Sequence, residues 1–461
     1  DKAMREERAR YYNPTLDLFF NVSKEYETPH VKWLKPYSEG KIKTLYLCYM
    51  NRLDDMNKRD VIELEQRLGM DYKFIPLLSK SEGGGGHVYL SGELEPYIID
   101  VVQEEIKKEY DLIIVNKFNF KTMPDDLSQE LLTEVKKGKG LLLIECSNMP
   151  SEINKLLTKA NQLNTPDDFI NMPEINKSLK SSRQVPQICK IWKVDKGKVA
   201  TVTLRGKIYP CVPPVEPGMV EEFYPNYYGR EIPYWEYKMF PTIKTAAYLA
   251  NKESSIKINE FLINEGKVNV KIQGNLGGEA SLEVEINNRY GQREKFEKYP
   301  LNLKKGDNAL SLPIPHLSGG LHLFDYRLIN SQGLVYDFGS YAFEVPVTSE
   351  IKQVKFPHPN PCYRANEEIR AEIILQNIRE NTNLTWYVED VYNRIINKGR
   401  QKLSKGQEKT DVTFRINYPL GILYRLFVEL EKNNENLSVS MGEFSMPFHF
   451  PPDDELMWYG R

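Results

Sequence analysis

Hydrophobic positions between residues 110 and 150 alternate between two aliphatic runs and one amphipathic segment. Residues 111–116 and 140–146 are short and almost continuously apolar, which is typical of strands buried on both faces. Between them, residues 124–137 carry apolar side chains at helical spacing, namely Leu127, Leu131, Leu132 and Val135. A proline and two aspartates suit the first turn of this helix, and two lysines suit its last turn. The pattern therefore predicts two parallel strands joined by a helix.

The alternation of strand and helix patterns extends on both sides of this stretch. The further segments that indicate strands or helices are 41–50, 51–68, 72–77, 95–108, 187–204 and 234–250. We therefore predict an α/β flavodoxin-like, three-layer domain over residues 41–253. Its strands 41–50, 110–116 and 140–146 should be parallel, adjacent and central, because runs this apolar must be covered on both faces.

From residue 256 onward, apolar and polar positions alternate strictly. Segments 268–272, 282–286 and 321–328 show this alternation and are separated by glycine turns. Short alternating strands at this spacing are typical of antiparallel β-sandwiches. A second block of similar size and order follows. We therefore predict two immunoglobulin-like β-sandwich domains, over residues 254–350 and 351–450.

Both ends of the chain differ from this regular pattern. Residues 1–40 are rich in proline and aromatic residues, and we expect an extended arm that lies over a later domain. Residues 451–461 are expected to begin a further segment or linker. The chain opens on Asp1, so we expect that a leader or an upstream segment has been removed.

Composition and charge narrow the classes of function. A chain of 461 residues should hold about three domains. Its formal net charge of −2 provides no basic field, which disfavours a nucleic-acid partner. No apolar run approaches the roughly 18 residues needed for a transmembrane helix. The protein is therefore expected to be globular, without a transmembrane segment.

Cysteines, histidines and glycines give no cofactor motif. The five cysteines are widely spaced and form no CxxC pair; only Cys189 and Cys211, which flank the predicted hairpin, could pair. The six histidines are scattered, so we expect no metal site. The glycine run at residues 83–86 lacks the spacing of a phosphate-binding loop. We expect no cofactor.

Several short stretches carry a resemblance to a known family; they are residues 110–115, 135–144, 196–200, 234–237 and 246–250. With them, residues 41–253 resemble the class I glutamine-amidotransferase-like fold in its non-catalytic branch, which is similar to the trimerisation domain of family 42 β-galactosidases and to ThuA-like domains. Followed by β-sandwiches, such domains resemble parts of large extracytoplasmic carbohydrate-active proteins. The resemblance therefore implies a periplasmic or secreted location.

Cys146 stands where that fold places its catalytic nucleophile. A catalytic elbow needs small neighbours, yet the residues beside Cys146 include no glycine. The resemblance also implies a histidine and glutamate late in the domain, but no histidine lies between His87 and His316. We predict that Cys146 is a buried, unreactive cysteine. His87 is a weaker candidate for a partner contributed by a loop, or simply an exposed loop histidine.

Two further candidate sites were weighed against simpler structural roles. Glu145, at a strand end, could pair with Glu236 as the two carboxyls of a glycosidase; a salt-bridged glutamate and a helix N-terminal glutamate are the simpler interpretation. Residues 223–237 concentrate aromatic rings and could bind a polysaccharide or pack against a partner subunit. The candidate ligand residues there are Tyr227, Tyr228, Tyr234, Trp235 and Glu236.

Three classes of function remain open. The first is a structural and interaction segment of an extracytoplasmic, glycoside-hydrolase-like protein, in which a degenerate amidotransferase-like domain mediates self-association or binding of a partner subunit. The second is a set of carbohydrate-binding modules that use the aromatic loop. The third is a hydrolase that uses Cys146 or Glu145. We favour the first, because the domain keeps its scaffold and lacks its catalytic partners.

Overall fold

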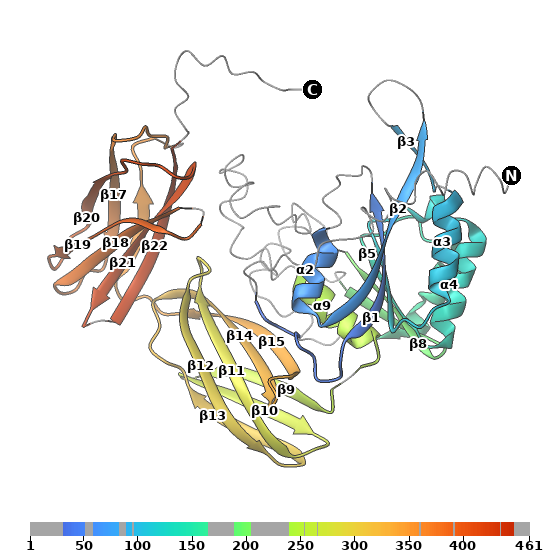
Figure 1. Cartoon of the computed structure of the whole chain (residues 1–461). Coiled ribbons are helices and arrows are strands. Elements are labelled where there is room, and N and C mark those ends of the chain that lie inside the picture. The colour runs from blue at the N-terminus through green and yellow to red at the C-terminus, as the bar shows by residue number, and fades with distance from the viewer. Residues whose placement is uncertain are drawn as a thin grey trace.

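The computed structural model describes most of the chain (Figure 1). The described residues are 31–50, 59–82, 89–94, 96–164, 189–203, 239–252, 254–264, 266–358, 361–390, 392–433 and 435–446. They form an α/β unit followed by two β-sandwiches, with the first sandwich between the other two units (Figure 1).

The α/β unit is built on one eight-stranded sheet with the order β3-β2-β1-β4-β5-β8-β7-β6. Its strands are β1 (Ile42–Met50), β2 (Met70–Glu82), β3 (Tyr89–Leu94), β4 (Leu112–Asn116), β5 (Gly140–Ile144), β6 (Gln162–Leu163), β7 (Cys189–Val194) and β8 (Gly197–Val202). Strands β2, β1, β4, β5 and β8 pair in parallel. The prediction that β1, β4 and β5 are adjacent, parallel and central is confirmed. Strand β3 pairs antiparallel at one edge and was not predicted.

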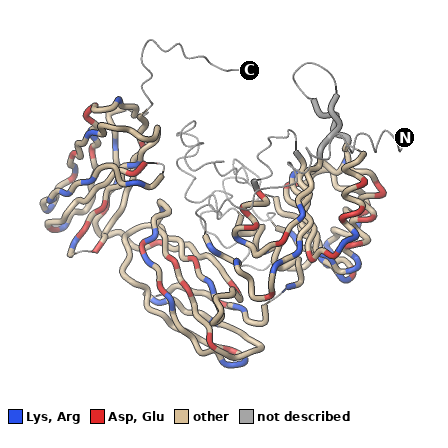
Figure 2. The backbone as a smooth tube through the Cα atoms, viewed as in Figure 1, with Lys and Arg blue, Asp and Glu red and all other residues tan. Residues whose placement is uncertain are grey.

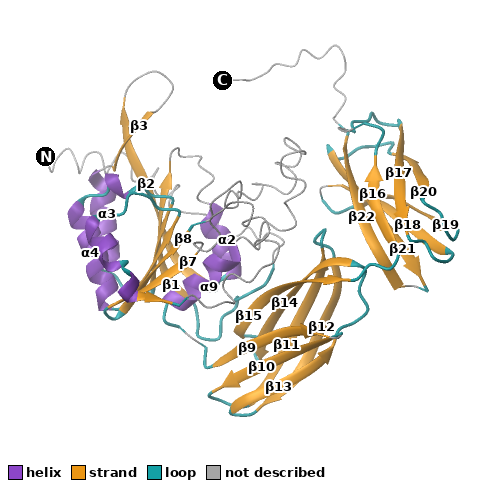
Figure 3. Cartoon of the chain, turned by 180° about the vertical axis from the view of Figure 1, so that it is seen from behind, coloured by secondary structure: helices purple, strands orange, loops and turns teal. Residues whose placement is uncertain are grey.

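Helices cover both faces of this sheet (Figure 3). They are α2 (Arg59–Arg67), α3 (Pro96–Ile106), α4 (Asp125–Lys137), α5 (Ser151–Leu156) and α9 (Phe240–Leu249). The apolar sides of α3, α4 and α5 share one hydrophobic cluster with the sheet, and those of α2 and α9 share another. Gly140 permits α9 to approach β5 closely, because a Cβ there would lie 2.4 Å from the carbonyl oxygen of Leu249.

Both sandwiches have seven strands with the same connectivity within the described residues. The first pairs sheets β13-β10-β9 and β12-β11-β14-β15, and the second pairs sheets β16-β17-β20 and β19-β18-β21-β22. Their strands are β9 (Ile256–Asn264), β10 (Lys267–Gly274), β11 (Gly278–Asn288), β12 (Arg293–Leu303), β13 (Gly306–Pro313), β14 (Gly320–Asn330), β15 (Val335–Val345), β16 (Glu350–Lys355), β17 (Glu368–Gln376), β18 (Thr382–Asp390), β19 (Ile395–Leu403), β20 (Lys409–Arg415), β21 (Leu423–Lys432) and β22 (Glu435–Ser445). These are immunoglobulin-like β-sandwiches, as the alternating pattern predicted.

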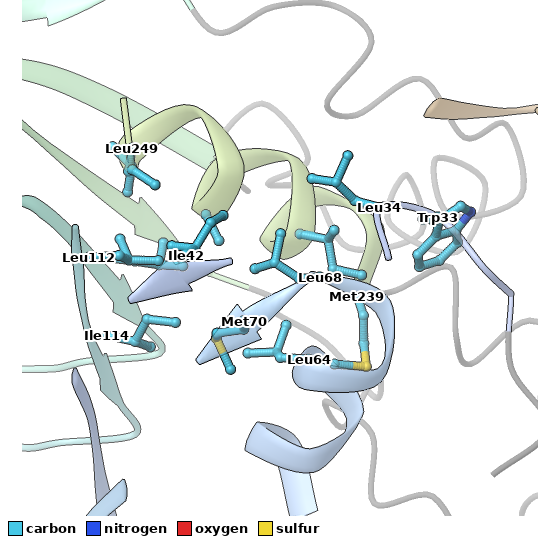
Figure 4. Packing of buried hydrophobic residues seen from close by; sticks show 14 of the residues in the cluster. Trp33, Leu34, Ile42, Leu64, Leu68, Met70, Leu112, Ile114, Met239 and Leu249 are labelled. Carbon is cyan, nitrogen blue, oxygen red and sulfur yellow. The ribbon is translucent and has the colours of Figure 1, made fainter. Parts of the chain in front are cut away.

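One hydrophobic cluster runs from the α/β unit into the first sandwich. It contains residues of β1, α2 and α9 together with five residues of the first sandwich: Leu323, Ile329, Val335, Phe338 and Ala342. Trp33 is fully buried, and its ring centroid lies 5.4 Å from that of Phe240 and 6.4 Å from that of Phe338 (cluster in Figure 4). The segment that precedes β1 therefore joins two cores into one.

Charged residues of both signs are interspersed over the described elements (Figure 2). No helix among the described residues is long and apolar enough to cross a membrane.

Candidate functional site

The backbone turns sharply where β5 ends. Strand β5 stops at Ile144, and Glu145 adopts a φ of 49°, a left-handed conformation that is uncommon outside glycine. Its backbone N–H donates to the carbonyl oxygen of Val202 at 2.9 Å, which attaches this turn to β8. The residue in the strained position is therefore Glu145, one position before the cysteine that the sequence identified.

Cys146 has the environment of a protonated thiol. The residue is half-buried, and burial of its thiol raises the pKa to about 12, although hydrogen bonds to the backbone oppose this shift. Its Sγ lies 3.2 Å from the carbonyl oxygen of Val115 and 3.5 Å from that of Ile144, so the S–H group donates within the strand ends. A nucleophilic cysteine needs a thiolate. This environment suppresses the thiolate at neutral pH.

A second set of polar side chains gathers around the carboxyl end of β4. We call Tyr46, Asp60, Asn116 and Lys117 the switch-point cluster. Asn116 closes β4 and is fully buried; its Nδ2 donates to Asp60 Oδ2 and to Tyr46 Oη, each at 3.0 Å. Lys117 Nζ is 3.2 Å from Asp60 Oδ2. These residues come from β1, α2 and the end of β4, and they form one connected hydrogen-bond network.

Electrostatics in this cluster raise the pKa of Asp60 above that of an ordinary aspartate. Burial raises the pKa of Asp60 to about 6, while Lys117 and Asn116 oppose that rise and Glu145 adds to it. Burial, together with the charge of Asp60, also raises the pKa of Tyr46 well above its ordinary value. The carboxyl of Asp60 is therefore mostly ionised at neutral pH, where it accepts hydrogen bonds, and becomes a donor only in mild acid.

The cluster occupies a special place in the sheet topology. The chain leaves β1 to form β2 on one side and later returns to form β4 on the other side of β1. In open α/β sheets, this reversal opens a crevice at the carboxyl ends of the two strands, and ligands bind there. Asn116 and Lys117 stand at the carboxyl end of β4.

Sequence reasoning missed this cluster. It considered Glu145 and Glu236 as a possible carboxyl pair and favoured simpler structural roles for both; Glu236 lies outside the described residues, and Glu145 instead influences the pKa of Asp60. One available signal was Asn116, a polar residue that closes an otherwise aliphatic, fully buried strand. Another was Asp60, an acidic residue in the first turn of the helix after a central strand.

The other predicted site residues are not placed by the structure. His87, Cys211 and the aromatic candidates Tyr227, Tyr228, Tyr234 and Trp235 lie outside the described residues. Cys189 is buried with its Sγ 3.2 Å from Thr245 Oγ1, and burial raises its pKa to about 11. Its pairing with Cys211 stays a prediction.

Ser318, His322 and Glu294 form a buried group in the first sandwich, where it meets the second. The Ser318 hydroxyl donates to Glu294, and His322 Nε2 lies 3.4 Å from Ser318 Oγ and 3.3 Å from Glu294 Oε2. The other ring nitrogen is 2.9 Å from the carbonyl oxygen of Gly320. A catalytic triad needs the serine and the acid on opposite nitrogens of the histidine. Here both face Nε2, which favours a structural role.

No group of three or more metal-ligating side chains gathers among the residues that the structure describes.

No protein-family model matches the sequence, and no curated protein matches it. Among solved structures, a glycosyl hydrolase family 2 member from Bacteroides cellulosilyticus matches with 11% identity and a TM-score of 0.18, over 39% of this chain and 28% of its own. The calcium-binding domain CBD12 of CALX1.1 matches with 10% identity and a TM-score of 0.15, over 38% of this chain and 79% of its own.

A tetra-tandem repeat from the extending region of a large adhesion protein matches with 8% identity and a TM-score of 0.19, over 42% of this chain and 49% of its own. This chain thus spans little more than a quarter of the glycosyl hydrolase and about half of the adhesion repeat. None of the three is named as an amidotransferase-like protein, so that resemblance stays a prediction.

Proposed function

We propose that this chain is a structural and interaction segment of an extracytoplasmic, glycoside-hydrolase-like multidomain protein. In this proposal, residues 41–253 are an amidotransferase-like domain without catalytic activity, which mediates assembly with a second copy or with a partner subunit. The sandwiches at residues 254–350 and 351–450 then act as rigid spacers that follow it.

The observation that carries the proposal is the hydrophobic cluster shared by the α/β unit and the first sandwich. Lys244, on α9, donates to the carbonyl oxygen of Phe338, and its Nζ lies 4.2 Å from the centre of the Phe338 ring. The backbone N–H of Val335 donates to the carbonyl oxygen of Pro36 at 2.8 Å. Buried rings and backbone pairing across a junction hold two units in one orientation, which suits a scaffold.

The environment of Cys146 also supports this function over a thiol hydrolase. A thiol whose pKa is about 12 is almost entirely protonated at neutral pH. Within the described α/β unit, no histidine is present to act as its base. The alternative in which the 223–237 loop binds polysaccharide stays a prediction, since that loop lies outside the described residues.

Thiol labelling tests the catalytic part of the proposal. Iodoacetamide should alkylate Cys146 in the native protein at least about a hundredfold more slowly than in the unfolded chain, because the native thiol is protonated. Peptide mass spectrometry separates Cys146 from Cys362, which is exposed and serves as the fast internal control. Rapid stoichiometric labelling of native Cys146 would instead support an enzyme.

Sedimentation equilibrium tests the assembly part. The wild-type protein should sediment as a multiple of its monomer mass, and Trp235→Ala should shift it to a smaller species, since a central aromatic anchor contributes about 2 kcal/mol or more to an interface. Tyr418→Ala is the matched control, because Tyr418 is 84% exposed on the second sandwich. A wild-type protein that stays monomeric at all concentrations would contradict assembly through this domain.

A further inference from the structure

The switch-point cluster contains one polar atom that the protein leaves unsatisfied. Asn116 is fully buried, and its Nδ2 donates to both Asp60 and Tyr46, but its Oδ1 has no hydrogen-bond partner among the residues that the structure describes. Buried polar atoms are satisfied in the great majority of cases, because leaving one without a partner costs free energy. An orphaned acceptor in an otherwise connected network suggests a missing donor.

The position of Asn116 in the sheet is a second, independent observation that indicates a ligand site. The cluster lies where the order of the strands reverses: Asn116 and Lys117 stand at the carboxyl end of β4, and Asn116 pairs with Cys48 in the second half of β1. That is where open α/β sheets bind their ligands. The side chains of Asp60 and Lys117 are 11% and 20% exposed, whereas Asn116 and Tyr46 are fully buried, so the network contacts solvent only at the Asp60–Lys117 edge.

We propose that the switch-point cluster binds a small neutral ligand with adjacent hydroxyl groups, such as one face of a monosaccharide or another polyol. Asn116 Oδ1 accepts a hydrogen bond from one hydroxyl of the ligand. Lys117 Nζ donates to the oxygen of a neighbouring hydroxyl, and Asp60 exchanges a hydrogen bond with either one. Tyr46 holds the Asn116 amide in the orientation that presents Oδ1.

The mixture of charges and hydrogen-bonding groups selects this class of ligand. Asp60 and Lys117 form an ion pair at 3.2 Å, so the site has little net charge when both are ionised. A phosphate would bring acceptors only, which would leave Asn116 Oδ1 unsatisfied and place an anion beside Asp60. An ammonium ligand would be repelled by Lys117. A hydroxyl both donates and accepts, so neighbouring hydroxyls can satisfy acceptor and donor side chains together.

Saturation-transfer NMR on the intact chain tests the proposal. The probes are D-glucose, D-galactose, D-mannose and myo-inositol, each up to about 100 mM, which covers weak single-site binding. Glucosamine and glucose 6-phosphate are the cationic and anionic counterparts. At least one neutral probe should bind saturably and more tightly than both charged counterparts.

Matched variants locate the binding. Asn116→Leu keeps the approximate shape but removes the acceptor, and Lys117→Met removes the donor at the more exposed edge; each should weaken binding by about tenfold or more. Lys137→Met, at a lysine on α4 whose side chain is 64% exposed, should leave binding unchanged. Near-ultraviolet circular dichroism checks that each variant is folded, and Lys117→Met keeps the test valid if Asn116→Leu does not fold.

Three results would overturn the proposal. The first is no saturable binding of any neutral probe. The second is preferential binding of glucose 6-phosphate or glucosamine. The third is binding that persists in folded Asn116→Leu or Lys117→Met but disappears in Trp235→Ala, which would place the sugar on the aromatic loop. If the protein failed to assemble in sedimentation, the sugar-binding test would still stand, because binding is tested at Asn116 and Lys117 and assembly at Trp235.

Discussion

The two junctions between the folded units differ in how much of each is formed by buried rings. Between the α/β unit and the first sandwich, the rings of Trp33, Phe240 and Phe338 pack against one another in a shared core. Between the two sandwiches, Gln292 donates to the hydroxyl of Tyr387, and the backbone N–H of Gly319 donates to a carbonyl oxygen of the second sandwich at 2.8 Å. The first junction adds an ion pair between Lys244 and Asp337 to its shared core, and the second adds one ring pair, Tyr290 and Phe427, to its hydrogen bonds. Only the first junction continues a hydrophobic cluster from one unit into the next.

This difference predicts different mechanical and pH behaviour. Burial of large rings stabilises a junction at every pH, because the rings do not titrate. Hydrogen bonds and carboxylates contribute about 1 kcal/mol each, and part of that depends on protonation. We therefore expect the α/β unit and the first sandwich to unfold together, and the second sandwich to separate from them more readily.

Trp33→Ala should have the largest effect. Removing a fully buried tryptophan from the shared core should lower the free energy of unfolding by about 3–5 kcal/mol. Hydrogen-exchange mass spectrometry should show loss of protection in both the α/β unit and the first sandwich, with the second sandwich unchanged.

The matched control for this prediction is Trp386→Ala in the second sandwich, whose ring centroid lies 5.5 Å from that of Phe414. Its effect should stay within that sandwich. If Trp33→Ala loosened the α/β unit alone, the shared core would not be one cooperative unit.

Asp60→Asn should have an intermediate effect, which is a change in how the free energy of unfolding depends on pH. Burial raises the pKa of Asp60 from 3.8 to about 6, so its stabilising contribution is fully present below pH 3.8 and is lost as the pH rises through about 6. The α/β unit should lose up to about 3 kcal/mol over that range, given 1.36 kcal/mol per pKa unit. Denaturant unfolding at pH 4 to 7 should show the free energy of unfolding of the wild type falling as the pH rises. In Asp60→Asn this dependence on pH should be weaker.

Glu294→Gln should have the smallest effect, and its pH dependence should have the opposite sign. Burial raises the pKa of Glu294, but hydrogen bonds from His322 and Ser318 outweigh this, so the net pKa is lowered from 4.5. Its contribution is therefore present above pH 4.5 and is lost as the pH falls through the lowered native pKa. We expect a loss of about 1 kcal/mol at neutral pH.

Small-angle scattering from pH 7 down to pH 3 should reveal the consequence for the second junction. The wild-type chain should expand at the acidic end, and Glu294→Gln should already be expanded at pH 7. Ser349 is a buried residue of the segment that links the sandwiches, and it donates to the backbone oxygen of Asn377; Ser349→Ala is the control and should not change the acid response. An acid expansion identical in the wild type and Glu294→Gln would assign the pH response to another group.

The amino-acid sequence determined the local elements and their class. Continuous apolar runs such as 140–144 specify buried parallel strands, and the strict alternation in β10 specifies a strand with one buried face. The helical face of α4 and its glycine C-cap follow from spacing and backbone conformation alone. These features depend on neighbours within a few residues, so a single sequence is sufficient to predict them.

The end of the predicted strand 140–146 shows where local reasoning stops being exact. β5 ends at Ile144, and Glu145, which follows it, has a left-handed backbone conformation. The backbone N–H of Glu145 donates to the carbonyl oxygen of Val202, in a strand that comes much later in the chain. The local sequence pattern gives no sign of such a contact.

Only the tertiary structure decided the switch-point cluster and the chemistry of the junctions. Asp60 and Asn116 lie on different elements, and Trp33 packs against Phe338 although the two are far apart in the sequence. Such pairs form because folding brings distant strand ends and faces together, and no periodicity in the sequence records which distant residues will meet. The hydrophobic pattern specified each layer, whereas the packing of layers against one another selected which polar groups became buried and which carboxyl groups acquired a shifted pKa.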